Sequence, residues 1–267
     1  LKNNKGTEDN RVRKLDYSIQ LSKLFYERFI NDEDITLFSP HEVPELYEAW
    51  GTDSFDELYQ TAERKTSVSK KKVSAQTLFF DMLKERAETG RIYIMNIDHC
   101  NTHSSFKDRI YMSNLCQEIT LPTTPINHID GEGEIALCIL SAINVGKLSY
   151  LEDLESLCDL AVRALDEIID HQKYPVKAAE VSTKARRSLG IGYIGLAHYL
   201  AKLKLNYNDK QAWKEVDELT ENFQYYLLKA SNELAKEKGQ CDYFHRTKYS
   251  DGILPIDTYK KEVDEIS

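Results

Sequence analysis

Apolar residues recur at helical spacing over much of the chain, with polar residues between them. A repeat of three to four residues predicts amphipathic helices. Gly90 and Gly239 each follow such a stretch and are expected to end it, because glycine readily adopts the backbone conformation found just beyond helices. The predicted helices cover residues 18–30, 45–50, 55–63, 68–88, 151–171, 189–203 and 211–238, and a last one begins at Pro255.

The middle of the chain follows a different pattern. β-Branched and other apolar residues gather in short runs at residues 91–98, 114–121 and 135–145, between segments rich in Gly, Pro, Asn and Asp. Such runs predict strands, with loops at residues 99–112 and 122–134. Long helices around a few buried strands indicate a helix-rich α/β fold.

The charge balance narrows the possible partners. The chain has 267 residues, enough for a sizeable core, and 35 Lys and Arg against 44 Asp and Glu give a net charge of −9. An acidic surface disfavours nucleic acid and anionic membranes as partners. The longest apolar stretch, residues 135–145, is far shorter than the roughly 20 residues of a membrane span. No signal-peptide pattern is visible in the first residues.

Cysteine usage points to a compartment. Five cysteines, an odd number, argue against a secreted disulfide framework and favour the reducing cytoplasm. In that compartment, a cysteine with a specific function is more often catalytic or metal-binding than part of a structural disulfide. Cys158 and Cys241 have no reactive companions nearby in the sequence, and a structural role is expected for both.

The segment 114–118, with the sequence NLCQE, carries the most informative chemistry. In an extended segment, Asn114, Cys116 and Glu118 lie on one face. A thiol between an amide and a carboxylate offers redox or radical chemistry, proton transfer and hydrogen bonding. A straight strand would hold residues 114 and 118 about 14 Å apart, so joint action on one small ligand requires the segment to curl. The alternative is a strand with a buried cysteine.

Three other patterns have competing interpretations. Cys138 lies in an apolar run, where a lone cysteine is usually a small buried hydrophobe. The sequence HCNTH at residues 99–103 could belong to a zinc site or to a hydrogen-bonded loop, and Cys116 with a histidine could form a hydrolase pair. The sequence RRSLGIG at residues 186–192 could hold phosphate before a helix, although its glycines more simply permit close packing.

These motifs together resemble the large, catalytic subunit of class I ribonucleotide reductase, over essentially the whole chain and in the family's order. The match covers only the middle of the family's longer polypeptide. The matching segments are LKNNKG (1–6), DITLFSP (34–40), NIDHCNTH (96–103), SNLCQEITLP (113–122), GEIALCILSAINVG (133–146), RRSLGIG (186–192), YYLLKASNELAKEKG (225–239) and GILPIDTYKK (252–261).

The resemblance implies a fold and an activity. The fold would be part of a ten-stranded α/β barrel, with a central finger loop whose tip is the NLCQE segment. The activity would be reduction of ribonucleoside diphosphates to deoxyribonucleotides, for DNA precursor synthesis. A helical lead-in is expected at 1–90, strands and the finger loop with the active-site residues at 91–146, and a helical part of the barrel at 147–267.

The resemblance also assigns roles. Cys116 would become the thiyl radical that abstracts the 3′ hydrogen, Glu118 would take the 3′-hydroxyl proton, and Asn114 would bond the ribose hydroxyls. Leu115 and Gln117 would add backbone contacts to the substrate. Cys138 would be one of two redox-active cysteines, and its partner would lie upstream of residue 1.

The implied partners follow from that chemistry. No cofactor or metal is expected in this chain, because a metal-containing small subunit would supply the radical and nucleotide effectors would bind outside this segment. Thioredoxin or glutaredoxin would be the reductant, and the full subunit would be a homodimer completed by further large-subunit segments. The chain alone is expected to be inactive. The alternatives are an assembly piece of a split subunit without activity of its own and a zinc-binding module.

Overall fold

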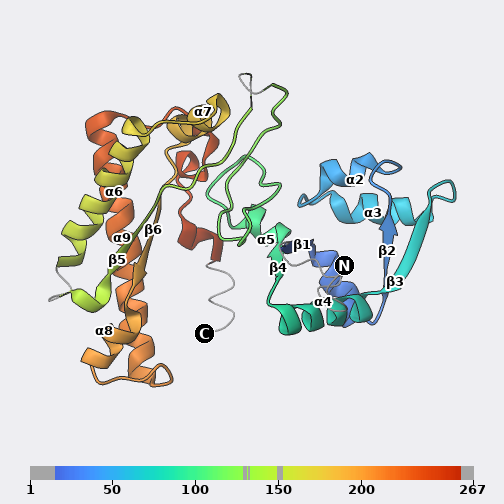
Figure 1. Ribbon diagram of the computed structural model, residues 1–267, viewed down its shortest axis with the longest axis horizontal. Coiled ribbons are helices and arrows are strands. Elements are labelled where there is room, and N and C mark those ends of the chain that lie inside the picture. The colour runs from blue at the N-terminus through green and yellow to red at the C-terminus, as the bar shows by residue number, and fades with distance from the viewer. Residues whose placement is uncertain (1–15, 129–130, 132, 149–152, 260–267) are drawn as a thin grey trace, which may run out of the picture. The chain divides into compact units, whose positions relative to one another are not determined.

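The computed structural model describes residues 16–128, 131, 133–148 and 153–259. The chain forms two compact units: unit 1 contains residues 1–122 and 246–267, and unit 2 contains residues 123–245. Figure 1 traces the chain in both units and labels the strands and most of the helices.

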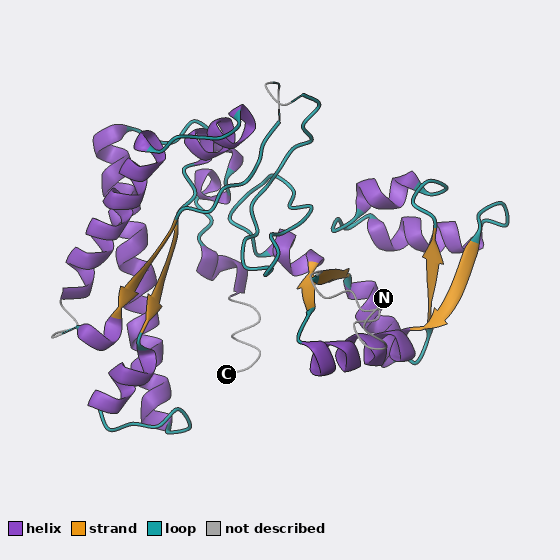
Figure 2. Ribbon diagram, in the orientation of Figure 1, coloured by secondary structure: helices purple, strands orange, loops and turns teal. Residues whose placement is uncertain are grey.

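Unit 1 alternates short strands with helices (Figure 2). Its strands are β1 (Tyr17–Leu21), β2 (Asp34–Phe38), β3 (Lys70–Ser74) and β4 (Ile92–Asn96). Its helices are α1 (Lys23–Ile30), α2 (Pro44–Ala49), α3 (Phe55–Arg64), α4 (Ala75–Thr89) and α5 (Ile97–Thr102), followed late in the chain by the 3₁₀ helix η4 (Lys248–Asp251) and a last turn of helix at residues 255–259.

The predicted helix at 18–30 is wrong over its first part. Residues 17–21 form β1, which pairs in parallel with β4, and α1 begins only after Ser22. The Ser22 side chain accepts a hydrogen bond from the Phe25 backbone N–H and so caps α1. A short strand followed by a capped helix produces apolar spacing that resembles one longer helix.

The predicted helix at 68–88 is also shortened by a strand. Residues 70–74 form β3, antiparallel to β2, and Ser74 caps α4 by accepting a hydrogen bond from the Thr77 N–H. Helix α4 ends at Gly90, which has a left-handed φ of 70°, as the sequence predicted. The short helices expected near residues 45–50 and 55–63 are confirmed as α2 and α3.

Unit 1 is held together by hydrophobic clusters that each join several elements. One cluster packs α2 and α3 against α1, and its members are Leu24, Val43, Leu46, Ala49, Phe55, Tyr59 and Ala62. A second joins β1, α1, β2 and α4, with Leu21, Phe25, Ile35, Ala75 and Met82. A third lies beneath β4 and α5, with Met95, Ile97 and Ile110. Burial of these side chains supplies the main favourable free energy of the unit.

Unit 2 consists of one parallel strand pair with helices. Figure 1 shows strands β5 and β6 beside the long helices α6 and α9. The elements are β5 (Leu140–Asn144), the 3₁₀ helix η2 (Val145–Lys147), α6 (Asp153–His171), α7 (Lys177–Arg186), β6 (Gly190–Ile194), α8 (Leu196–Lys202), α9 (Lys210–Lys238) and the 3₁₀ helix η3 (Phe244–Arg246) at its boundary with unit 1.

The predicted helix at 189–203 is wrong over residues 190–194, which form β6 in parallel with β5. A Cβ at Gly190 would lie 2.5 Å from Leu140 Cδ2, the end of an exposed side chain that can move aside, and 3.9 Å from the nearest backbone oxygen. A Cβ at Gly192 would meet nothing within 4 Å, so close packing requires glycine at neither position. The helices predicted at 151–171 and 211–238 are confirmed within the described residues as α6 and α9.

The other predicted strands are only partly correct. Residues 92–96 form β4 as expected, but of the run 135–145 only residues 140–144 are a strand. Residues 114–121 form a turn and loop, and α5 occupies part of the predicted loop 99–112. The described residues contain three two-stranded sheets and no closed sheet, so they do not by themselves form a barrel. No helix among them is long and apolar enough to cross a membrane.

Candidate active site

The segment 113–119 curls into a tight loop in unit 1. The Gln117 backbone N–H donates to the Asn114 carbonyl oxygen at 3.2 Å, and the Gln117 side-chain amide donates to the same oxygen at 3.1 Å. Gln117 adopts a left-handed φ of 64°, which is uncommon for a residue other than glycine. The expected curl is therefore present, and it takes the form of a turn.

The Asn114 side chain closes this loop from inside. Its Oδ1 accepts hydrogen bonds from the Ile119 backbone N–H at 3.1 Å and from the Ser113 hydroxyl at 3.2 Å. The Ser113 hydroxyl is also 2.5 Å from the Ile119 carbonyl oxygen. Because Oδ1 is already used, a ligand would meet the amino group of the Asn114 amide. The loop is thus fixed by its own polar groups, and its tip needs no strand partner.

The tip of the loop presents its functional groups to solvent. Cys116 and Glu118 are exposed, and the Leu115 side chain is 60% exposed. A thiol and a carboxylate two residues apart on an exposed turn can reach the same small molecule. The buried-cysteine alternative for this segment is wrong, because Cys116 is exposed.

Tyr93 is a neighbour of Cys116 that the sequence did not reveal. Tyr93 lies on β4, and hydrogen bonding to Cys116 is the largest of the effects that raise the pKa of the Tyr93 hydroxyl. The loop therefore brings the thiol to a phenol on a regular strand. Nothing in the sequence pattern couples these two positions, because the chain between them contains a helix and an irregular segment.

Cys138 lies in unit 2, two residues before β5 begins. Its side chain is exposed, whereas the next residue, Ile139, is buried in a cluster with Leu165 and Ile169. The interpretation of Cys138 as a small buried hydrophobe is therefore wrong. The structure therefore places the Cys138 thiol at the surface of unit 2.

The remaining cysteines belong to the packing of the two units. Cys100 is packed against the cluster beneath β4 and α5, and burial raises the pKa of its thiol. Burial raises the pKa of Cys158, on α6, to about 11, and also raises the pKa of Cys241. A thiol with a raised pKa is a poor nucleophile at neutral pH. A structural role for Cys158 and Cys241 is consistent with this burial.

The HCNTH segment forms α5 and its end. The His99 and His103 rings meet edge to face with centroids 5.3 Å apart, and His103 stacks on Tyr259 at 5.2 Å. Over the part of the chain that the structure describes, no three His, Cys, Asp or Glu side chains gather closely enough to hold a metal ion. The zinc alternative therefore gains no support from the geometry.

The two arginines of RRSLGIG are engaged in ion pairs. Arg186 is buried and binds Glu134 through two hydrogen bonds, of 2.6 and 3.0 Å. Arg187 binds Asp166 and Asp170, both on α6, at 2.6 and 2.9 Å. These pairs fasten α7 to α6 and to the loop before β5. The arginines thus stabilise unit 2, and the geometry does not favour the phosphate interpretation.

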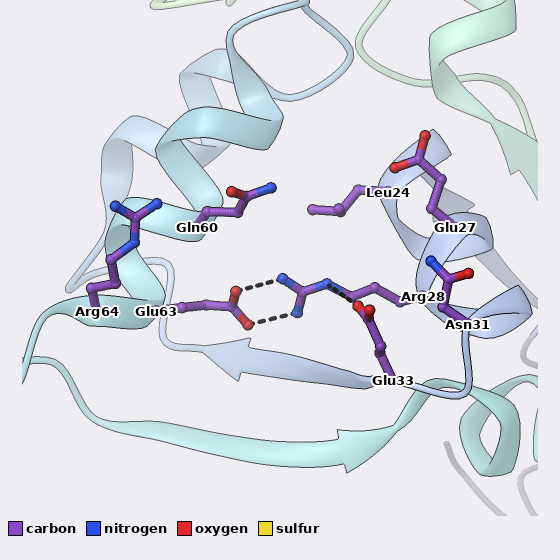
Figure 3. Close-up of a pocket in the computed structure, with 8 residues that line it drawn as sticks. All are labelled: Leu24, Glu27, Arg28, Asn31, Glu33, Gln60, Glu63 and Arg64. Carbon is purple, nitrogen blue, oxygen red and sulfur yellow. Dashed lines mark hydrogen bonds and ion pairs between the residues drawn. The ribbon is translucent and has the colours of Figure 1, made fainter.

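A separate pocket of about 420 Å³ lies between α1 and α3 in unit 1. Figure 3 shows Arg28 between Glu63 and Glu33 in this pocket. Arg28 donates to both carboxylate oxygens of Glu63, at 2.7 and 2.5 Å, and lies 4.0 Å from Glu33. The residues expected to carry chemistry do not line it. Its arginine is already paired, so the pocket is a feature of the packing of α1 and α3.

Known proteins are similar to this chain along its full length. Ribonucleoside-diphosphate reductase subunit alpha of Haemophilus influenzae is 55% identical over 273 residues. Ribonucleoside-diphosphate reductase 1 subunit alpha of Escherichia coli is 54% identical over 273 residues, and the subunit alpha of Enterobacteria phage T4 is 44% identical over 275 residues. In each case 100% of this chain is aligned, but only 36% of the relative, so the chain spans about a third of the length of these relatives.

The family model described as the ribonucleotide reductase barrel domain matches residues 1–266. The match includes the Asn114–Glu118 turn, the strand pair β5–β6 and the helices that pack against it. It agrees with the motif order in the sequence and with the helix-rich α/β structure of both units. The chain therefore belongs to the ribonucleotide reductase barrel-domain family.

Proposed function

We propose that this chain carries the radical chemistry of a ribonucleoside-diphosphate reductase large subunit. The observation that carries the proposal is the closed turn at 113–119, which exposes Cys116 and Glu118 together while Asn114 holds its base. The names of the relatives support a nucleoside diphosphate as substrate. An exposed thiol beside a carboxylate suits hydrogen-atom transfer coupled to proton transfer.

In the proposed reaction, each residue of the turn has one task. Cys116, as a thiyl radical, takes the 3′ hydrogen atom of the ribose and becomes a thiol. Glu118 accepts the proton of the 3′-hydroxyl group while the 2′-hydroxyl group leaves as water. Asn114 hydrogen-bonds the ribose hydroxyls, and the backbone of Leu115 and Gln117 contacts the substrate. The hydrogen atom returns from Cys116 to C3′ at the end.

The electrons come from a second thiol pair. Cys138 and one further cysteine outside this chain are oxidised to a disulfide, and together they supply the two electrons and two protons that the loss of water requires. The products are a deoxyribonucleotide, water and the disulfide. A dithiol protein such as thioredoxin or glutaredoxin reduces that disulfide again, which suits a reducing cytoplasmic compartment.

The proposal assigns the missing parts to the rest of the subunit. The turn at 113–119 would be the tip of a finger loop within a ten-stranded barrel, completed by strands beyond the three pairs described here. Residues 91–146 would carry the active-site residues, with 1–90 leading into the barrel and 147–267 contributing its helical part. A metal-containing small subunit would provide the radical to Cys116, nucleotide effectors would bind elsewhere, and the full subunit would form a homodimer.

The test is Cys116→Ser in the reductase assembled from this chain, the other large-subunit segments and the small subunit. Serine keeps the size and polarity of the side chain but cannot form a thiyl radical. We expect deoxynucleotide formation to fall to background, and Cys241→Ser, on a cysteine held by packing, to retain turnover. Unchanged product formation by Cys116→Ser would overturn the proposal and favour an inert assembly piece.

A further inference from the structure

The backbone that leads into the catalytic turn is bound by the side-chain amide of Asn101. Its Oδ1 accepts from the Ile110 backbone N–H at 2.8 Å, and its Nδ2 donates to the Ile110 carbonyl oxygen at 3.1 Å. The same Nδ2 also donates to the Ile97 carbonyl oxygen, within α5, at 3.0 Å. One amide thus binds the backbone of Ile110 as a neighbouring strand would, and ties it to α5.

A second amide holds the next residue. Gln20, on β1, donates from Nε2 to the Tyr111 carbonyl oxygen at 2.8 Å, and its Oε1 accepts from the Trp50 indole N–H. Tyr111 stands only two residues before Ser113, where the turn closes. The approach to the turn is therefore bound at two successive residues, from β1 on one side and from α5 on the other.

The Asn101 anchor lies against the buried core of unit 1. Ile97 and Ile110 are fully buried in the cluster beneath β4 and α5. Gly51 packs against this anchor with a φ of 74°, and a Cβ there would lie 2.9 Å from Asn101 Nδ2 and 2.8 Å from Ile97 Cγ1. A glycine at this position leaves room for the Asn101 amide. Because a side chain at residue 51 would collide with the Asn101 amide, that amide is closely packed against the backbone of Gly51.

We propose that Asn101 and Gln20 form an amide clamp that positions the Cys116 turn, which makes them positioning residues for the proposed reduction. The role in catalysis rests on the proposed function, whereas the clamp itself rests on the contacts above. The hydrogen bonds of both side chains go to groups other than Cys116. Their effect passes through the backbone of Ile110 and Tyr111 to the base of the turn. Displacement of a reacting group by about 1 Å can cost roughly 100-fold in rate.

The chemistry of an amide provides a sharp test. An amide donates and accepts at once and carries no charge at any working pH. In Asn101→Asp, the carboxylate still accepts from the Ile110 N–H but faces two carbonyl oxygens that it cannot bond. When it is protonated, the carboxylic acid regains one donor and restores the pair with Ile110. The carbonyl oxygens of Ile97 and Ile110 disfavour the charged carboxylate and should raise its pKa above the ordinary value of about 3.9. The defect of Asn101→Asp should therefore be full at pH 8 and diminish as the pH falls toward that raised pKa.

The first measurement is amide hydrogen exchange of residues 109–119 in the chain itself. Asn101→Asp is compared with the unsubstituted chain at the same pH, because intrinsic exchange rates change with pH. We expect exchange at least several-fold faster at pH 8 and a clearly smaller ratio at pH 5. Asn222→Asp is the matched control, because the Asn222 amide donates to the Glu218 carbonyl oxygen of its own helix, far from residues 109–119 in the sequence. The β2–β3 pair reports whether unit 1 remains folded.

Gln20→Glu is the second variant, for use if Asn101→Asp fails to fold. Its carboxylate can accept from Trp50 but loses the bond to the Tyr111 carbonyl until it is protonated, so the same dependence on pH is expected. Exchange at 109–119 that is unchanged at pH 8 in both variants, with unit 1 still folded, would overturn the clamp.

Turnover of the assembled reductase tests whether the clamp matters for catalysis, independently of whether the clamp contacts exist. We expect kcat of Asn101→Asp to fall roughly 10- to 100-fold at pH 8 with KM little changed, and the loss relative to the unsubstituted enzyme to shrink toward pH 5. A pH-dependent exchange defect without any loss of kcat would overturn the positioning role. If Cys116→Ser stays active, the proposed function fails, whereas the exchange result still decides the clamp.

Discussion

At the scale of single residues, the contact between Tyr93 and Cys116 can be tested by titration. The hydrogen bond to Cys116 raises the pKa of the Tyr93 hydroxyl above its ordinary value. We predict that Cys116→Ala lowers the Tyr93 pKa toward the ordinary value of about 10. NMR of tyrosine labelled at the ring carbon that bears the hydroxyl would follow this titration. Tyr26 is an internal reference, because burial alone raises its pKa and Cys116→Ala should leave it unchanged.

Individual residues also show which features of the candidate site can be predicted from the sequence. Asn114, Cys116 and Glu118 could be selected because a thiol, an amide and a carboxylate at alternate positions are an unusual combination. The turn that carries them could not be foreseen, because it depends on a left-handed Gln117 and on two bonds accepted by Asn114 Oδ1. Such a conformation is stabilised by the folded loop and leaves no pattern in the sequence.

At the scale of elements, Gly192 within β6 and Gly195 at the start of α8 can be compared. Gly195 has a φ of 81°, and a Cβ there would collide with the Asn144 Oδ1 atom and lie 3.1 Å from the Gly146 backbone nitrogen. We predict that Gly195→Ala lowers the free energy of unfolding by about 1–3 kcal/mol. Gly192→Ala, in open space, should change it by less than about 1 kcal/mol. Urea unfolding followed by circular dichroism measures both, and equal losses would contradict this account of Gly195.

The Arg28–Glu63 pair links α1 to α3 and should make the stability of unit 1 depend on pH. Burial opposes ionisation of Glu63, but hydrogen bonds from Arg28 and Thr36 outweigh it and hold the Glu63 pKa below its ordinary value. A pKa lowered by folding adds stability that is present above the unfolded value, about 4.3, and is lost as the pH falls through the lower folded value.

We therefore predict that Glu63→Gln makes the decline of the free energy of unfolding shallower between about pH 5 and pH 3. Urea unfolding at several pH values measures this slope. The control is Glu57→Gln, on the same helix but exposed. If Glu63→Gln, like Glu57→Gln, leaves the pH dependence of the free energy of unfolding unchanged, the Arg28–Glu63 pair does not make stability depend on pH.

Three strands that the sequence analysis assigned to helices share one physical cause. Strands β1, β3 and β6 each have five residues and stand directly before a helix. Over so short a segment, period-two and helical spacing are hard to distinguish, and pairing with a distant strand decides the outcome. Helices α6 and α9 were predicted because their apolar spacing continues over many turns.

At the scale of the whole molecule, the proposed activity requires more than this chain. The electron balance needs a second cysteine beside Cys138, and Cys116 needs a source for its radical. We predict that the chain alone forms no deoxynucleotide from a ribonucleoside diphosphate and a dithiol reductant. Product formation is measured with and without the remaining subunit segments and the small subunit. Turnover by the chain alone would show that the proposed division of labour is wrong.

The strand pairs of unit 1 are nested along the chain. Register pairs Asp34 with Ser74 in β2–β3, and this pair lies wholly within the stretch that separates Tyr17 from Ile92 in β1–β4. Bringing β1 and β4 together in an extended chain costs more loop-closure entropy than joining the inner strands. Formation of the inner pair shortens the effective loop for the outer one. The order of assembly should therefore run from β2–β3 outward, with the base of the Cys116 turn among the last parts of unit 1 to become ordered.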